Sequence, residues 1–76
     1  MVEEKAVGAL LRELRRKKGM SQELLSGLAG LDRTHYSKIE SGLRSPTIDT
    51  LFKIAAALEI PPHQIIFQLE EHIKTP

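Results

Sequence analysis

The sequence predicts an all-α protein, a compact bundle of five short helices. Apolar residues recur at helical spacing along the chain, no strand-like alternation occurs, and Gly or Pro marks the expected breaks. Because the chain has 76 residues, 41% of them hydrophobic, we expect residues 1–76 to form a single domain. The expected helices span about 5–18, 22–29, 33–41, 48–58 and 62–74.

The first two helices are separated by a glycine and a capping residue. Gly19 follows a turn rich in Lys and Arg, where a left-handed residue often ends a helix, and Ser21 suits an N-cap. Helical spacing assigns the inward-facing side chains of these helices, which are Val7, Leu10, Leu11 and Leu14, then Leu24, Leu25 and Leu28.

The last three helices have their own start and stop residues. Asp32 and Thr47 suit N-caps, Gly42 suits a helix end, and Pro61 stands where the fifth helix would have a capping side chain. The inward-facing side chains are expected to be Tyr36, Ile39, Glu40 and Leu43, then Ile48, Leu51, Ile54, Ala55 and Leu58, then Ile65, Ile66, Leu69 and Ile73.

The composition argues against several classes of protein. There is no Cys for a disulfide or a thiolate metal site, and His35, His63 and His72 lack the spacing of metal ligands. Residues 60–69, the longest uncharged stretch, are too few to cross a membrane, and no signal peptide is visible. No arrangement of side chains indicates catalysis, so we expect a cytoplasmic protein that is not an enzyme and uses no metal or cofactor.

The basic residues are concentrated in the first half of the chain. The net charge is only +1, but residues 5–44 hold nine Lys or Arg against four Asp or Glu. This half suits an anionic partner, although solvated helix faces give the same pattern.

The second and third helices have the pattern of a helix-turn-helix, which a plain three-helix bundle can also show. They are joined by Gly30-Leu31-Asp32, and Gly30 permits the positive φ of such a turn. His35 lies between two faces of the third helix, where it either touches a phosphate or is a plain surface residue. The outward face holds no acid, and its residues are types that contact base edges and phosphates: Arg33, Thr34, Ser37, Lys38 and Ser41.

Four segments resemble one family. Gly19-Met20-Ser21-Gln22, Leu31-Asp32-Arg33-Thr34, Ser37-Lys38-Ile39-Glu40 and Gly42-x-Arg44-x-Pro46 are similar to the Cro and repressor type of helix-turn-helix protein, the XRE family, over about residues 7–67. Within this family the chain looks most like restriction–modification controller proteins. The resemblance implies a lambda-repressor-like DNA-binding domain and a transcriptional regulator whose partner is double-stranded DNA.

The resemblance also implies roles for individual residues. Gln22 would contact a phosphate and brace the third helix, and Arg44 would lie near the DNA backbone or minor groove. Glu40 would form an internal ion pair with Arg15, which otherwise is one more surface charge. Tyr36 stands where the family usually has Ile or Val, so we expect its ring in the core and its hydroxyl at the core edge, with a phosphate contact as the alternative. The DNA-contacting residues are then Gln22, Arg33, Thr34, His35, Ser37, Lys38, which could reach a base or the backbone, and Arg44.

A second copy of the chain is the other expected partner. Phe67 lies off the inward stripe of its helix, and similar family members dimerise through the last two helices, which adds Phe52, Ile60 and Ile66 as candidates. A dimer places two recognition helices about one turn (roughly 34 Å) apart, on a near-palindromic operator. No effector domain follows the fifth helix, so no small-molecule effector is expected. The alternative is an antitoxin-like protein-interaction module with the same fold.

Overall fold

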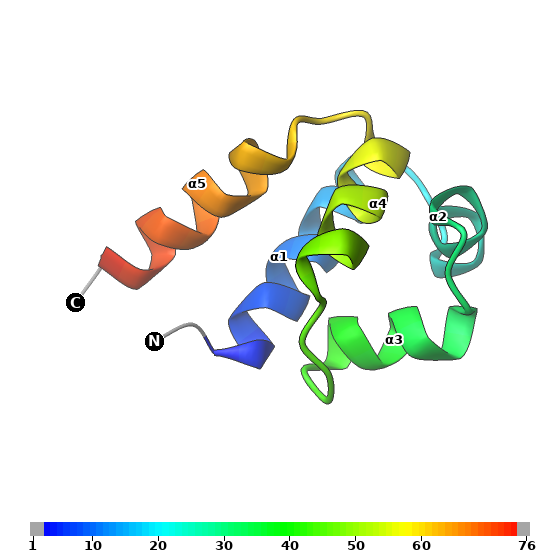
Figure 1. Ribbon diagram of the computed structural model, residues 1–76, viewed down its shortest axis with the longest axis horizontal. Coiled ribbons are helices and arrows are strands. Elements are labelled where there is room, and N and C mark those ends of the chain that lie inside the picture. Colours follow the sequence, from blue (N-terminus) through cyan, green and yellow to red (C-terminus); the bar gives the residue numbers. More distant parts are fainter. Residues whose placement is uncertain (1–2, 75–76) are drawn as a thin grey trace.

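The structure of the chain, a computed structural model, consists of five helices joined by short loops (Figure 1). It describes residues 3–74, and the side chains of residues 3–72. The helices are α1 (Glu4–Lys17), α2 (Gln22–Ala29), α3 (Arg33–Ser41), α4 (Ile48–Leu58) and α5 (Pro62–Lys74). Four of them have the bounds that the sequence predicts, and α1 begins and ends one residue earlier than expected.

Capping side chains begin helices and glycines end them, as their residue types predict. Gly30 and Gly42 end α2 and α3 in the left-handed conformation, with φ angles of 70° and 84°. The sequence predicts where α4 ends but not the conformation there: Glu59 takes a positive φ of 60° although it has a Cβ. The N-cap side chains of α2, α3 and α4 each accept a hydrogen bond from the backbone N–H three residues later: Ser21 from Leu24, Asp32 from His35 and Thr47 from Thr50. Glu3, the N-cap of α1, makes no such bond.

α1 runs through the middle of the bundle, with α2 and α3 on one side and α5 on the other (Figure 1). It packs against α3 and α5, while α2 packs against α3 and α4, and α4 also packs against α5. The radius of gyration is 11.4 Å, the value expected for a well-packed domain of this length. Seven large side chains at the centre are fully buried: Leu11, Leu25, Tyr36, Ile39, Ile54, Leu58 and Ile65.

Five side chains that the sequence assigns to the core lie at the surface instead. They are Leu24, Leu28, Leu43, Ile48 and Ile66, which expose 50%, 60%, 71%, 70% and 46% of their surface. In α2 the buried residues are Leu25, Ser26 and Ala29. The small side chains of Ser26 and Ala29 let this short helix pack against α3 and α4. Because α2 turns this side toward the core, Leu24 and Leu28 face outward.

The other three residues are exposed for local reasons. Leu43 follows the glycine that ends α3, so the helical count no longer applies to it, and Ile48 is the first residue of α4. α5 packs along the line of Ile65, which leaves Ile66 beside the contact. The remaining residues assigned to the core are buried or partly buried. Ile73 lies outside the side chains that the structure describes.

A glycine inside α1 sets the distance between α1 and α3. Gly8 is buried, and a Cβ at its position would overlap the backbone carbonyl oxygens of Ile39 and Glu40. The last turn of α3 is therefore seated directly on the backbone of α1, at a depth that only glycine permits.

Candidate nucleic-acid interface

α3 turns one face toward the core and the opposite face toward solvent. Tyr36 and Ile39 are fully buried on the inner face. The five residues of α3 that the sequence predicts to contact DNA all lie outside the buried core: Arg33, Thr34 and Lys38 are exposed, and His35 and Ser37 are half-buried. The structure thus brings these five side chains together on one helix, around its outer surface.

The outer face of α3 carries positive charge and no carboxylate within the helix. Glu40, the acid of α3, is buried on the opposite side. Asp32, which precedes the helix, accepts a hydrogen bond from the backbone N–H of His35 at 3.2 Å, so its carboxylate is held by the cap. Arg33 and Lys38 remain exposed. A helix face of this charge suits a polyanion.

The loop after α3 places Arg44 close to the same surface. The backbone N–H groups of Leu43 and Arg44 donate to the carbonyl oxygen of Lys38, at 2.9 and 3.3 Å. These bonds fold the start of the loop back onto the last turn of α3. Arg44 itself is exposed, so its side chain is free to extend beside the outer face.

A buried ion pair joins α1 to α3 beneath this face. Arg15 Nε donates to Glu40 Oε2 at 2.6 Å, and Arg15 Nη2 donates to Glu40 Oε1 at 3.1 Å. The two side chains expose only 10% and 3% of their surface. Two parallel hydrogen bonds between a planar guanidinium and a carboxylate fix the orientation of both groups.

Further hydrogen bonds extend this pair into a cluster. Gln22 Nε2 donates to Glu40 Oε1 at 2.9 Å, the Tyr36 hydroxyl donates to Glu40 Oε2, and Arg15 Nη1 donates to the Met20 carbonyl oxygen at 2.8 Å. Among the described residues, no buried side-chain nitrogen or oxygen lacks a hydrogen-bond partner. We call Arg15, Gln22, Tyr36 and Glu40 the Glu40 cluster. It ties α3 to α1 and to the start of α2.

Only part of the Glu40 cluster was expected from the sequence. The resemblance implies the pair of Arg15 with Glu40, and the structure contains that pair. The Tyr36 hydroxyl was expected at the core edge, but Tyr36 is fully buried and its hydroxyl donates to the carboxylate four residues later. The sequence analysis did not predict this bond, although the spacing of four residues, which puts both side chains on one helix face, is a signal for it. Gln22 is half-buried and donates one of its two amide N–H bonds to Glu40, and its contact with a phosphate stays a prediction.

The hydrogen bonds of the cluster decide the charge of its central carboxylate. Burial by itself raises the pKa of Glu40, but the hydrogen bonds from Arg15, Tyr36 and Gln22 outweigh burial and lower it below its ordinary value. The hydrogen bond with Glu40 raises the pKa of Arg15, and burial raises the pKa of Tyr36. At neutral pH the cluster therefore holds a carboxylate, a guanidinium and a neutral phenol.

The residues predicted for a dimer interface lie on α4, on α5 and in the loop between them. Phe52 and Phe67 expose 56% and 57% of their surface, and Ile66 is also exposed. Ile60 is only partly buried but packs against the core, so it offers less surface to a partner. Ile48, one turn before Phe52, adds an exposed apolar side chain to α4.

The described residues hold neither a cluster of metal ligands nor a membrane-spanning helix. Within residues 3–72, no three His, Asp or Glu side chains gather as metal ligands. Among the described helices, none is long and apolar enough to span a membrane. The exposed and half-buried polar side chains described above make the outer surface of α3, together with Gln22 and Arg44, the candidate site.

The sequence of this chain matches a known family and known regulators. The model of the helix-turn-helix family matches residues 11–65. The control protein C.MunI of a Mycoplasma species is 38% identical over 65 residues, which cover 84% of this chain and 88% of that protein.

Solved structures share the whole arrangement of helices. The restriction–modification controller protein C.AhdI of Aeromonas hydrophila aligns with a TM-score of 0.81 and 40% identity, over 86% of this chain and 98% of that one. C.Esp1396I, in a structure bound to a 19 base pair DNA duplex, aligns with a TM-score of 0.85 and 33% identity, over 96% of this chain and 97% of that one. Because the family model covers most of the chain and these relatives align over nearly their full length, this chain belongs to the helix-turn-helix family of transcriptional regulators.

Proposed function

We propose that this chain regulates transcription as a dimer that binds a near-palindromic operator, with α3 in the major groove. The outer face of α3 supports this function, because it has no acid and is exposed above the fully hydrogen-bonded Glu40 cluster. A helix held in this way presents its side chains in one orientation. Readout of base edges depends on such fixed geometry.

The outer face offers several kinds of contact to base edges. Arg33, in the first turn of α3, would donate two hydrogen bonds to a guanine, and the methyl group of Thr34 would contact a thymine methyl. Ser37 can hydrogen-bond to either kind of base pair. Lys38 can reach a base or the backbone, because its side chain is long and exposed.

Other residues are suited to the DNA backbone. Gln22 is the first residue of α2, where a phosphate would also meet the free backbone N–H groups of the helix N-terminus. Arg44 extends from the loop that is bonded to the end of α3. His35, half-buried at the margin of the face, either touches a phosphate or is a plain surface residue. These contacts would set the position of α3 without selecting a sequence.

The relatives favour a controller of restriction–modification genes over an antitoxin-like module. C.AhdI is a restriction–modification controller protein, and so is C.Esp1396I, one structure of which holds a DNA duplex. A role of this kind implies a protein that acts on DNA in the cytoplasm without catalysis. It also fits a small regulator whose effect on transcription depends on its own concentration and on its dimerisation.

The dimer would form through α4 and α5. These helices pack together, and they expose Phe52, Ile66 and Phe67. Burying these side chains against a second copy would remove apolar surface from water and supply stability that one small core lacks. A two-fold axis would then place two copies of α3 about one helical turn of DNA (roughly 34 Å) apart.

Selection of bound duplexes from a random pool tests this function. We expect enrichment of one near-palindromic sequence whose half-sites are about one helical turn apart. Enrichment of a sequence without two-fold symmetry would contradict the dimer. Equal binding of every duplex, or binding of none, would contradict sequence-specific regulation itself.

A further inference from the structure

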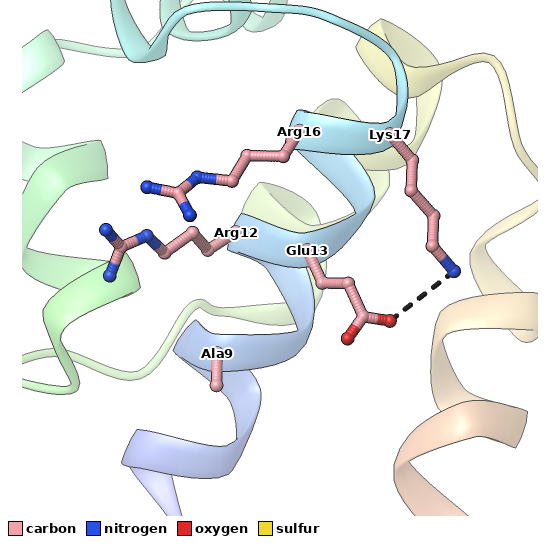
Figure 2. Close-up of a pocket in the computed structure, with 5 residues that line it drawn as sticks. All are labelled: Ala9, Arg12, Glu13, Arg16 and Lys17. Atoms are coloured by element: carbon pink, nitrogen blue, oxygen red, sulfur yellow. Dashed lines mark ion pairs between the residues drawn. The ribbon is translucent and has the colours of Figure 1, made fainter.

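Two arginines on α1 have no partner within the described chain. Arg12 and Arg16 stand one helical turn apart and point in the same direction (Figure 2). Within residues 3–72, neither guanidinium forms an ion pair or a side-chain hydrogen bond. The neighbouring acid Glu13 instead pairs with Lys17 at 3.5 Å, on the other side of the shallow groove that these side chains line.

The helix itself does not account for this pair of charges. Like charges four residues apart on a helix repel each other and destabilise it. Arg16 lies in the last turn of α1, where a cation is favoured by the helix dipole. Arg12 lies one turn earlier, where this effect has largely faded. An anion bound between the two guanidiniums would turn their repulsion into attraction.

The arginines stand on the face of α1 that borders the recognition helix. The backbone of Gly8 and the side chain of Arg15 both contact Glu40 of α3. Farther toward the start of α1, Lys5 lies against Gly42 at the end of α3. The turns that hold the arginine pair are thus beside the helix that would enter the groove. Gln22, which is also predicted to contact DNA, shares the Glu40 cluster with Arg15, the residue before Arg16.

We propose that Arg12 and Arg16 bind phosphates of the DNA strand that flanks the major groove occupied by α3, an inference that rests on the proposed function. A guanidinium presents paired N–H donors whose planar geometry matches phosphate oxygens. The pair extends the surface formed by Gln22 and Arg44 onto α1, and it is exposed and unpaired as that role requires. Such contacts add affinity and fix position, and they select no bases.

The test measures how DNA affinity depends on salt for a variant in which both charges are removed. The duplex is the operator selected with the parent protein. For R12Q/R16Q we expect the slope of log affinity against log salt to fall by nearly two per half-site, since each lost phosphate contact removes about 0.9. Between about 50 and 200 mM salt, the parent should therefore lose about tenfold more affinity per half-site than the variant. The base preference should stay unchanged.

A matched variant controls for net charge. K17Q/K18Q removes two charges from the end of α1 and its C-cap. Lys17 points away from the arginines (Figure 2), and Lys17 and Lys18 line a second groove with Leu58 and Ile60. We expect this variant to keep the parent slope. R12K/R16K should also keep it, because lysine still neutralises a phosphate.

The outcomes separate this inference from the proposed function. If the parent binds a selected operator and R12Q/R16Q keeps its slope, or loses no more than K17Q/K18Q, the arginines do not bind the backbone and the proposed function stands. An unchanged slope is also the result expected if the pair serves a protein partner. A changed base preference would likewise overturn the inference. If the parent selects no duplex at all, the proposed function itself has failed.

Discussion

Gly8 of α1 lies directly against the backbone carbonyl of Glu40 in α3, with no room for a Cβ between them. The carboxylate of the same Glu40 is held by Arg15, about two turns farther along α1. α1 therefore holds one residue of the recognition helix twice, by its main chain and by its side chain. This arrangement fixes both the depth and the rotation of α3, so the outer face has a defined orientation.

Replacing Gly8 with alanine should destabilise the protein by about 1–3 kcal/mol, because the added methyl group would overlap backbone atoms that cannot move alone. Gly27→Ala is the matched control, since Gly27 is a helical glycine with open space around it. That change should stabilise the protein by about 0.5–1 kcal/mol, the difference in helix propensity. Urea denaturation of both variants measures the two effects. Equal stability of Gly8→Ala and the parent would show that α1 and α3 are not in close contact.

Removing the carboxylate of Glu40 should be far more damaging than breaking a surface ion pair. Glu40→Ala leaves the buried guanidinium of Arg15 without its counter-ion, so we expect a loss on the order of 3 kcal/mol. Tyr36→Phe removes a single hydrogen bond to this carboxylate and should lose about 1.5–3 kcal/mol. Thermal and chemical denaturation give both values. A melting temperature of Glu40→Ala equal to that of the parent would contradict a structural role for the pair.

Stability should depend on pH through Glu40. The hydrogen bonds in the cluster lower its pKa in the folded chain below the ordinary value of 4.5, so the unfolded chain binds a proton there more readily. The stabilisation is therefore fully present above about pH 5 and is lost as the pH falls through the folded pKa. Glu40→Gln should be less stable than the parent at neutral pH but lose less stability on acidification. Parallel stability curves from about pH 6 to pH 3 would argue against this assignment.

Arg33 should read a guanine in each half-site of the operator. Arg33→Ala should weaken binding by about 1–3 kcal/mol and relax the preference at one base pair per half-site, because a bidentate contact to O6 and N7 is lost. Repeating the selection from a random pool with the variant measures both changes. Retention of full affinity and of the same preferred sequence would remove Arg33 from the readout.

Phe67 should be buried between two copies of the chain. Phe67→Asp introduces a charge into that interface, so we expect a monomer that binds a half-site weakly and without cooperativity. The melting temperature of the parent should rise with protein concentration, and that of the variant should not. Sedimentation of the parent at micromolar concentration decides the matter. A monomeric parent, with an unchanged footprint for Phe67→Asp, would mean that α5 only closes the bundle.

Local signals in the sequence were sufficient for the helices and for the surface of α3. Caps such as Ser21, Asp32 and Thr47 act within three residues, so the start of a helix can be predicted from its own neighbours. The outer residues of α3 follow from helical spacing once Tyr36 is placed inward. Glu59 escaped prediction because its positive φ is imposed by the connection from α4 to α5, and its residue type gives no sign of it.

The sequence by itself determined the five helices, the helix-turn-helix pattern and the residue types on the recognition face, because each depends on residues within one or two turns. Only the tertiary structure decided which apolar residues of α2 and α5 are buried, as the exposed Leu24, Leu28 and Ile66 show. It also decided that Gly8 meets the end of α3, and that Tyr36 and Gln22 join a carboxylate already paired with Arg15. Arg15 and Glu40 are 25 residues apart in the chain. Contacts over such a separation depend on how whole helices pack, since helical spacing says which side chains share a face but not which neighbour covers that face.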